Sequence, residues 1–183
     1  MLYLALLHYP VMNKDGKIIT TAIVNADIHD VARAARTYGV KTFYIVNPVE
    51  AQRKLAGEII KHWQDGYGAD FNKLRKEAFS LVRLKKTLQD VIDEIKEENG
   101  IEPKTIATTA HQTEGFLTFS SLKEKLENNK LPYLLIFGTG SGLTQKIIKG
   151  ANFCLEPIRG VDNYNHLAVR SAAVVILDRI RNI

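Results

Sequence analysis

Six short apolar runs, most of them separated by longer amphipathic stretches, constrain the fold of this chain more than any other feature. Apolar runs of this length are typical of buried strands, and they occur at residues 2–8, 42–47, 79–84, 105–108, 133–137 and 152–155. The amphipathic stretches predict helices at residues 27–38, 48–64, 85–98, 120–128 and 164–180. The alternation predicts an α/β fold with a mainly parallel sheet and helices on both faces.

Length and composition predict one domain over residues 1–183, because 183 residues with 45% hydrophobic content suffice for one ordinary core. The longest apolar runs, residues 131–137 and 172–177, are far shorter than the ~20 residues of a membrane helix. The apolar start lacks a basic segment and a cleavage site, so we expect no secretory signal and a cytoplasmic location. The single cysteine, Cys154, is expected to be a buried, inert thiol.

The charge of the chain suits an anionic partner. A net charge of +5 and a pI near 9.2 favour nucleic acid, because binding to phosphates releases counterions, although simple solubility remains the alternative. His8 and His111 show no metal-ligand spacing with other histidines or with the cysteine, so we predict no metal site.

The most informative stretch is residues 134–144, an apolar strand that runs directly into a loop with three glycines. A dinucleotide-binding fingerprint is one interpretation, and Glu156 lies near the position of a ribose-binding acid. However, Leu143 occupies the third glycine position, and only residues 144–150 precede the next apolar run. That connection is shorter than the ~10 to 12 residues of a crossover between parallel neighbours. A phosphate-binding P-loop is excluded, because Gly-Lys-Ser/Thr does not follow Gly138 at the required offset.

A second informative stretch, residues 155–179, passes from a strand through a Pro/Gly loop into a terminal helix. The polar cluster at residues 162–166 is expected at the start of that helix, where free backbone amides favour a polar ligand. Ala168, Ala172, Ala173 and Ile176 form a small apolar face at helical spacing. This face indicates core packing, although packing against a second subunit would give the same pattern.

Together these stretches resemble the later motifs of the SPOUT RNA methyltransferases, in residues 137–143, 155–158 and 164–173. Residues 27–40 are similar to the first motif of that family, in which an arginine precedes a glycine by six residues, as Arg33 precedes Gly39. The resemblance is closest to a bacterial subfamily sometimes fused to a tRNA guanine methyltransferase. It implies a deep C-terminal trefoil knot that binds S-adenosyl-L-methionine, a homodimer, and methyl transfer to RNA, either tRNA or rRNA.

The resemblance also implies three walls of a cofactor pocket. They are Thr108, Thr109 and Ala110; Phe137, Gly138, Thr139, Gly140, Gly142 and Leu143; and Leu155, Ile158, Tyr164, Asn165, His166 and Leu167. All three segments follow the carboxyl ends of expected strands, where open parallel sheets bind ligands. For the threonines, ordinary loop capping is the alternative.

For catalysis, the resemblance implies Arg33, Asn165 and His166. Arg33 is the candidate for orienting the acceptor or binding its phosphate, and a simple surface arginine is the alternative. Asn165 and His166 are candidates for positioning the acceptor. Asp27 is a candidate for flanking the same site, but it is equally well interpreted as a helix N-cap, so we assign it no role. Residues 164–167 read Tyr-Asn-His-Leu where ribose methyltransferases often resemble Ser-Leu-Asn, which puts ribose methylation in doubt and leaves the choice between a ribose and a base nitrogen as the acceptor open. A non-catalytic RNA-binding or S-adenosylmethionine-sensing protein with the same fold is the alternative function.

Overall fold

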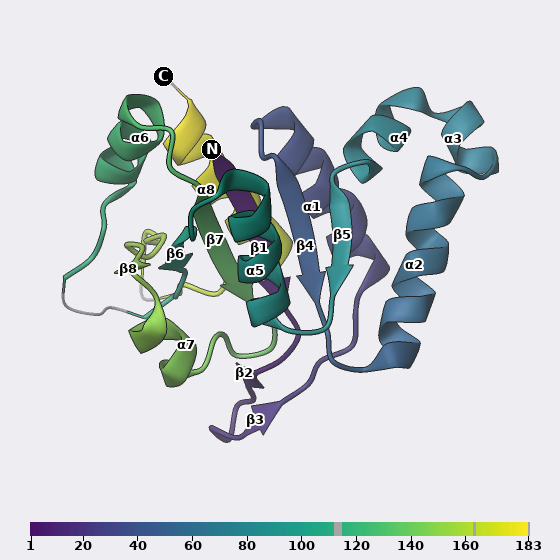
Figure 1. Ribbon diagram of the computed structural model, residues 1–183. Coiled ribbons are helices and arrows are strands. Elements are labelled where there is room, and N and C mark those ends of the chain that lie inside the picture. Colours follow the sequence, from purple (N-terminus) through teal and green to yellow (C-terminus); the bar gives the residue numbers. More distant parts are fainter. Residues whose placement is uncertain (112–114, 163, 183) are drawn as a thin grey trace.

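The computed structural model describes residues 1–111, 115–162 and 164–182, and its centre is one six-stranded sheet (Figure 1). The strands run in the order β5-β4-β1-β7-β6-β8, and all their pairings are parallel. Their bounds are β1 Leu2–Leu7, β4 Thr42–Val46, β5 Val82–Lys85, β6 Lys104–Ala107, β7 Tyr133–Gly138 and β8 Phe153–Cys154. The predicted α/β class with a parallel sheet is confirmed.

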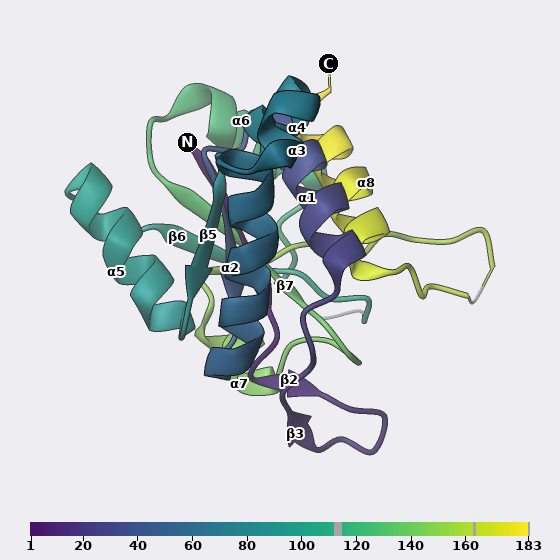
Figure 2. The ribbon, with the colours of Figure 1, turned by 90° about the vertical axis from the view of Figure 1, so that its right-hand side faces the viewer.

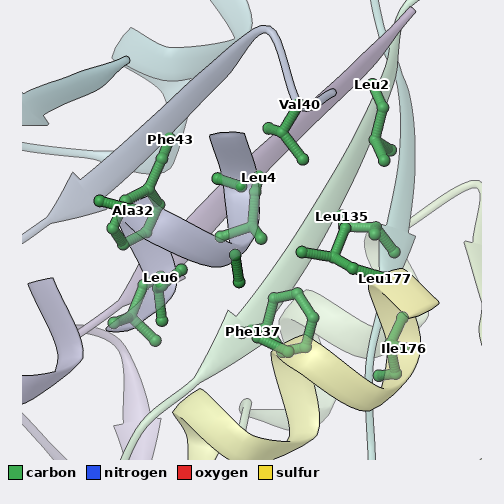
Figure 3. Packing of buried hydrophobic residues seen from close by; sticks show 14 of the residues in the cluster. Leu2, Leu4, Leu6, Ala32, Val40, Phe43, Leu135, Phe137, Ile176 and Leu177 are labelled. Carbon is green, nitrogen blue, oxygen red and sulfur yellow. The ribbon is translucent and has the colours of Figure 1, made fainter. Parts of the chain in front are cut away.

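Helices cover both faces of this sheet, as predicted. Side chains of α1 (Asn25–Thr37), α2 (Glu50–Gln64), α4 (Lys73–Phe79), α6 (Phe119–Asn128) and α8 (Val169–Arg181) form one core with the strands. Figure 3 shows Leu135 and Phe137 of β7 packing in it with Ile176 and Leu177 of α8. The opposite face is covered by α5 (Leu88–Asn99) and α7 (Gln145–Gly150). None of the described helices is long and apolar enough to cross a membrane.

A small antiparallel hairpin, β2 (Val11–Met12) and β3 (Ile18–Ile19), follows β1. Its turn is fixed by the Asn13 side chain, whose oxygen accepts hydrogen bonds from the backbone amides of Asp15 and Lys17. Figure 1 shows the hairpin beyond the ends of the strand arrows, at the carboxyl edge of the sheet. The hairpin therefore lies at the edge where parallel sheets bind ligands.

Several element boundaries differ from the sequence prediction. The strand expected from Phe79 begins at Val82, because Phe79 ends α4, and both α3 (Tyr67–Phe71) and α4 occupy residues for which no helix was predicted. The helix expected over residues 164–180 begins at Val169, so the cluster at 162–166 precedes the helix, and its Asn163 lies outside the described residues. The prediction of a polar cluster at a helix N-terminus is therefore wrong.

The connection between β7 and β8 also differs from the prediction. Residues 139–152, which include α7, join these strands, and β8 pairs with β6 rather than with β7. The predicted short connection is wrong, because it omitted the glycine loop itself. The trefoil knot stays a prediction.

Candidate functional site

Three of the predicted site segments meet at the carboxyl edge of the sheet. Strand β6 pairs with β7 on one side and with β8 on the other, so the residues that follow the three strands lie close together. The amide and the hydroxyl of Thr108 both donate to the Ile136 carbonyl, at 3.0 and 2.9 Å. The Leu155 amide donates to the Ala107 carbonyl at 2.9 Å. The structure thus brings the starts of the three predicted walls together.

The glycines of the loop after β7 are required by the conformation of the loop itself. A Cβ atom on Gly138 would lie 2.6 Å from the Leu143 amide nitrogen, because the loop folds back on its own start. Gly140 and Gly142 have φ angles of +62° and +105°, in the region that favours glycine. A Cβ on Gly140 would also lie 2.8 Å from the Met12 carbonyl oxygen. These glycines are therefore required for the shape of the loop itself.

The N-terminal segment holds this loop from the side of β1. The Ser141 amide donates to the Met12 carbonyl at 2.8 Å, and the Met12 amide donates to the Gly142 carbonyl at 2.9 Å. The amide and the hydroxyl of Thr139 both donate to the Leu7 carbonyl, at 3.1 and 3.0 Å. Since β7 lies between β1 and β6, the opposite side of the loop faces the end of β6.

The apolar and hydroxyl side chains of the predicted walls are largely engaged within the protein. The side chains of Phe137, Leu143 and Leu155 are buried in the two cores, and the Thr109 hydroxyl accepts a hydrogen bond from the His111 amide at 3.1 Å. For Thr108 and Thr109 the structure therefore shows the loop capping that the sequence left open. What these positions offer a ligand is backbone, together with the half-buried Ile158.

The segment before α8 forms a projecting arm (Figure 2). Tyr164 is 73% exposed and Leu167 is 50% exposed, and the Tyr164 ring packs edge-on against His166. The Asn165 side-chain amide donates to the Ala110 carbonyl at 3.0 Å, which ties the arm to the end of β6. Of the residues predicted at 164–167, Asn165 is thus placed directly at the wall, while the other three are largely exposed to solvent.

Arg33 lies in a groove of about 400 Å³ between α1 and α8, which Arg170 also lines. Arg170 pairs with Asp27 at 3.2 Å and with Asp30 at 3.5 Å. Asp27 is buried and lies inside α1, whose N-cap is Val24, so the interpretation of Asp27 as the N-cap is wrong. Sequence reasoning missed Arg170, because its pairing with Asp27 spans 143 positions of the chain.

His8 is a further residue that the sequence did not single out beyond excluding it as a metal ligand. It follows β1 and is fully buried, and its Nδ1 atom lies 3.0 Å from the Thr21 hydroxyl. The Thr21 hydroxyl in turn is hydrogen-bonded to the Thr139 hydroxyl in the glycine loop. Burial lowers the pKa of His8 from 6.5 to about 4, against the opposing effects of the Asp27 carboxylate and the Ala22 carbonyl. His8 is therefore neutral at physiological pH.

Comparison with known sequences gives the family of this chain. A family profile described as SAM-dependent RNA methyltransferase matches residues 1–182. An uncharacterized protein of Aquifex aeolicus is 40% identical over 97% of this chain and 87% of its own length. A tRNA (guanine-N(1)-)-methyltransferase of Oleidesulfovibrio alaskensis is 41% identical over 98% of this chain, but the chain spans only 41% of that relative.

Comparison with solved structures bears on the fold alone, because the sequence identities are low. A methylase family protein of Neisseria gonorrhoeae has a TM-score of 0.65 at 18% identity, over 98% of this chain and 80% of its own. An AdoMet-bound rRNA methyltransferase of Sinorhizobium meliloti has a TM-score of 0.58 at 13% identity, over 98% of this chain and 55% of its own. The likeness to these methyltransferases covers the whole sheet and its helices.

The buried neutral state of His8 predicts a pH dependence of stability. The pKa of about 4 in the folded protein lies below the ordinary 6.5, so between these values the unfolded chain binds the proton more readily. We expect the free energy of unfolding to fall as the pH drops through this window, by about 3 kcal/mol at most.

Urea unfolding of the wild type and of His8→Gln at about pH 7 and about pH 5 measures this contribution. His29, whose pKa is also lowered by burial, is present in both proteins, so its effect cancels in the difference. The variant should lose less stability than the wild type between the two pH values. Equal losses would show that His8 does not titrate differently in the folded and unfolded states.

Proposed function

Because this chain belongs to the family of S-adenosylmethionine-dependent RNA methyltransferases, we propose that it transfers the cofactor's methyl group to a structured RNA in the cytoplasm. The observation that carries the proposal is the meeting of three strand-end segments, including the glycine loop, at one edge of the sheet. For the RNA we propose tRNA, with rRNA as the second candidate, since two relatives are named tRNA methyltransferases. The chain spans only 41% of either relative, so the N1 atom of guanine is not carried over.

The residues at this edge fit S-adenosylmethionine. Backbone groups of the loops after β6, β7 and β8 surround the edge, and Ile158 adds a half-buried apolar side chain. This combination suits a nucleoside with a charged amino-acid tail, which needs an apolar contact for its ring and polar contacts for its ends. We propose that the three predicted walls hold the cofactor through their backbone, with Asn165 fixing the arm against the β6 wall.

When bound, the cofactor supplies an electrophilic methyl group, so the main task of the protein is to align the acceptor. We propose that Arg33 and Arg170, which line the same groove, hold an RNA phosphate, since a guanidinium matches phosphate geometry. Asp27 and Asp30 orient the Arg170 guanidinium. His166, exposed on the arm, is the proposed group near the acceptor, whereas the buried His8 cannot reach it.

Transfer of radiolabelled methyl to RNA from a strain lacking the gene tests this function directly.

Cofactor binding should depend on Gly138. In Gly138→Ala, the new Cβ would collide with the Leu143 amide nitrogen and open the loop, so we expect S-adenosylmethionine to bind at least about tenfold more weakly in calorimetry. Gly150→Ala is the matched control, because a Cβ there meets nothing within 4 Å, and its affinity should equal that of the wild type. Unchanged affinity in a folded Gly138→Ala protein would place the pocket elsewhere.

Arg33 should affect methyl transfer without affecting cofactor affinity. Losing a guanidinium that holds an RNA phosphate removes about 1.5 to 3 kcal/mol, so Arg33→Ala should slow transfer at subsaturating RNA by about tenfold or more. Arg33→Lys should restore part of the rate. The control is Arg36→Ala on the same helix, because Arg36 pairs with Glu77 and does not line the groove. Full activity of Arg33→Ala would identify Arg33 as a simple surface residue.

We also propose a homodimer in which α1 and α8 pack against a second copy along one border of this groove, which leaves Arg33 and Arg170 open to RNA. Val174 lines the groove and is 38% exposed, and the nearby arm exposes Val161 completely. Light scattering at micromolar concentration should therefore give twice the chain mass. Val174→Asp should yield monomers, whereas Ile101→Asp, at a comparably exposed position beyond α5, should leave the dimer intact. A monomeric wild type would contradict the proposed homodimer.

A further inference from the structure

Three side chains form a continuous hydrogen-bonded chain from the end of β1 to the glycine loop. The Nδ1 atom of His8 lies 3.0 Å from the Thr21 hydroxyl, which is hydrogen-bonded to the Thr139 hydroxyl. The Thr139 hydroxyl lies 3.0 Å from the Leu7 carbonyl oxygen and is buried. The contacts join positions that are 118 and 132 residues apart, so the chain of bonds exists only in the folded protein.

The direction of each bond follows from counting hydrogens, because each threonine hydroxyl has a single hydrogen to donate. The Leu7 carbonyl can only accept, so Thr139 donates to it and must accept from Thr21. Thr21 has then used its hydrogen and must accept from His8. His8 therefore donates to Thr21, Thr21 donates to Thr139, and Thr139 donates to the Leu7 carbonyl.

This direction fixes the tautomer of His8. Its proton lies on Nδ1, and Nε2 carries a lone pair. Nε2 is buried and has no hydrogen-bond partner among the described residues. Protonation of Nε2 would bury a positive charge, and this cost outweighs the favourable effects of the Asp27 carboxylate and the Ala22 carbonyl. Full burial and the bond count thus agree on one neutral form.

We propose that His8 is a positioning residue for the cofactor, which acts through the hydroxyls of Thr21 and Thr139 to hold the loop between Gly138 and Gly140 in its binding conformation. The inference rests on the proposed function of this loop as a cofactor wall. Thr139 is flanked by two glycines, whose backbone freedom makes the loop costly to order when a ligand binds. Holding Thr139 before binding removes part of that cost. His8 itself is buried and does not contact the cofactor.

A pair of His8 variants separates positioning from packing. In His8→Asn, the side-chain amide nitrogen is as many bonds from the backbone as Nδ1, so it retains the donor to Thr21 while losing bulk. In His8→Leu, the bulk is largely retained but the donor is lost. Positioning predicts that S-adenosylmethionine binds to His8→Asn within about threefold of the wild type, and to His8→Leu about tenfold or more weakly. A role in packing alone predicts that His8→Leu binds at least as tightly as His8→Asn.

Thr21 offers a second and independent pair. Thr21→Ser keeps the hydroxyl, so its cofactor affinity should match the wild type, whereas Thr21→Val removes the hydroxyl at similar size and should weaken binding as much as His8→Leu does. The double variant His8→Leu, Thr21→Val should bind no more weakly than either single variant, because the loss of one hydrogen bond already disconnects His8 from Thr139. Additive losses would overturn the proposal.

Amide hydrogen exchange of the cofactor-free protein tests positioning without any ligand. The amides of residues 139–142 should exchange faster in His8→Leu and Thr21→Val than in the wild type, Thr21→Ser and His8→Asn. If the wild type binds S-adenosylmethionine but these variants match it in affinity and exchange, only the positioning role fails. If the wild type does not bind S-adenosylmethionine, the proposed function fails and the role of His8 toward the cofactor fails with it, even where loop exchange changes.

Discussion

The parallel pairing of β1 with β7 is the constraint on which the rest of the site depends. Their register, from Leu2 opposite Tyr133 to Leu7 opposite Gly138, makes both strands end at the same level of the sheet. Residues that follow them, such as His8 and Thr139, are therefore neighbours although they are far apart in the sequence. Because both strands are buried on both faces, a slip by one residue would move every side chain into the opposite core and disrupt the packing of both. The position of the glycine loop is thus fixed by the core.

The sheet could be predicted from sequence because central parallel strands are continuous apolar runs, as β1 and β7 are. The missed elements depend on tertiary contacts instead. Gly68 lies within α3, and a Cβ there would come within 2.7 Å of the Trp63 ring, so close packing between helices requires this glycine. The helix start at Val169 was missed because the polar residues 162–166 resemble a helix start in sequence, whereas Asn165 in fact donates to the Ala110 carbonyl before the helix begins.

The candidate site was predictable where it follows from strand ends and local motifs, and not where it depends on distant partners. The segments after β6, β7 and β8 are recognisable in sequence, and Arg33 lines the groove between α1 and α8, while its role toward RNA stays a proposal. In contrast, His8, Thr21 and Arg170 have no local signature. His8 and Thr21 depend on the buried Thr139 hydroxyl. Arg170 depends on the buried Asp27 carboxylate, which also lies far away in the sequence. Periodicity carries no information about such contacts.

Asp27 connects the two halves of the site. Its buried carboxylate pairs with Arg170 in the groove and acts electrostatically on His8, which holds the glycine loop through Thr21. A buried carboxylate needs a cationic partner to offset the loss of its hydration, and Arg170 on α8 provides it. The same ion pair therefore joins α8 to α1. Asp27 thus contacts the proposed phosphate groove directly through Arg170, whereas it acts on the proposed cofactor loop only through its electrostatic effect on His8.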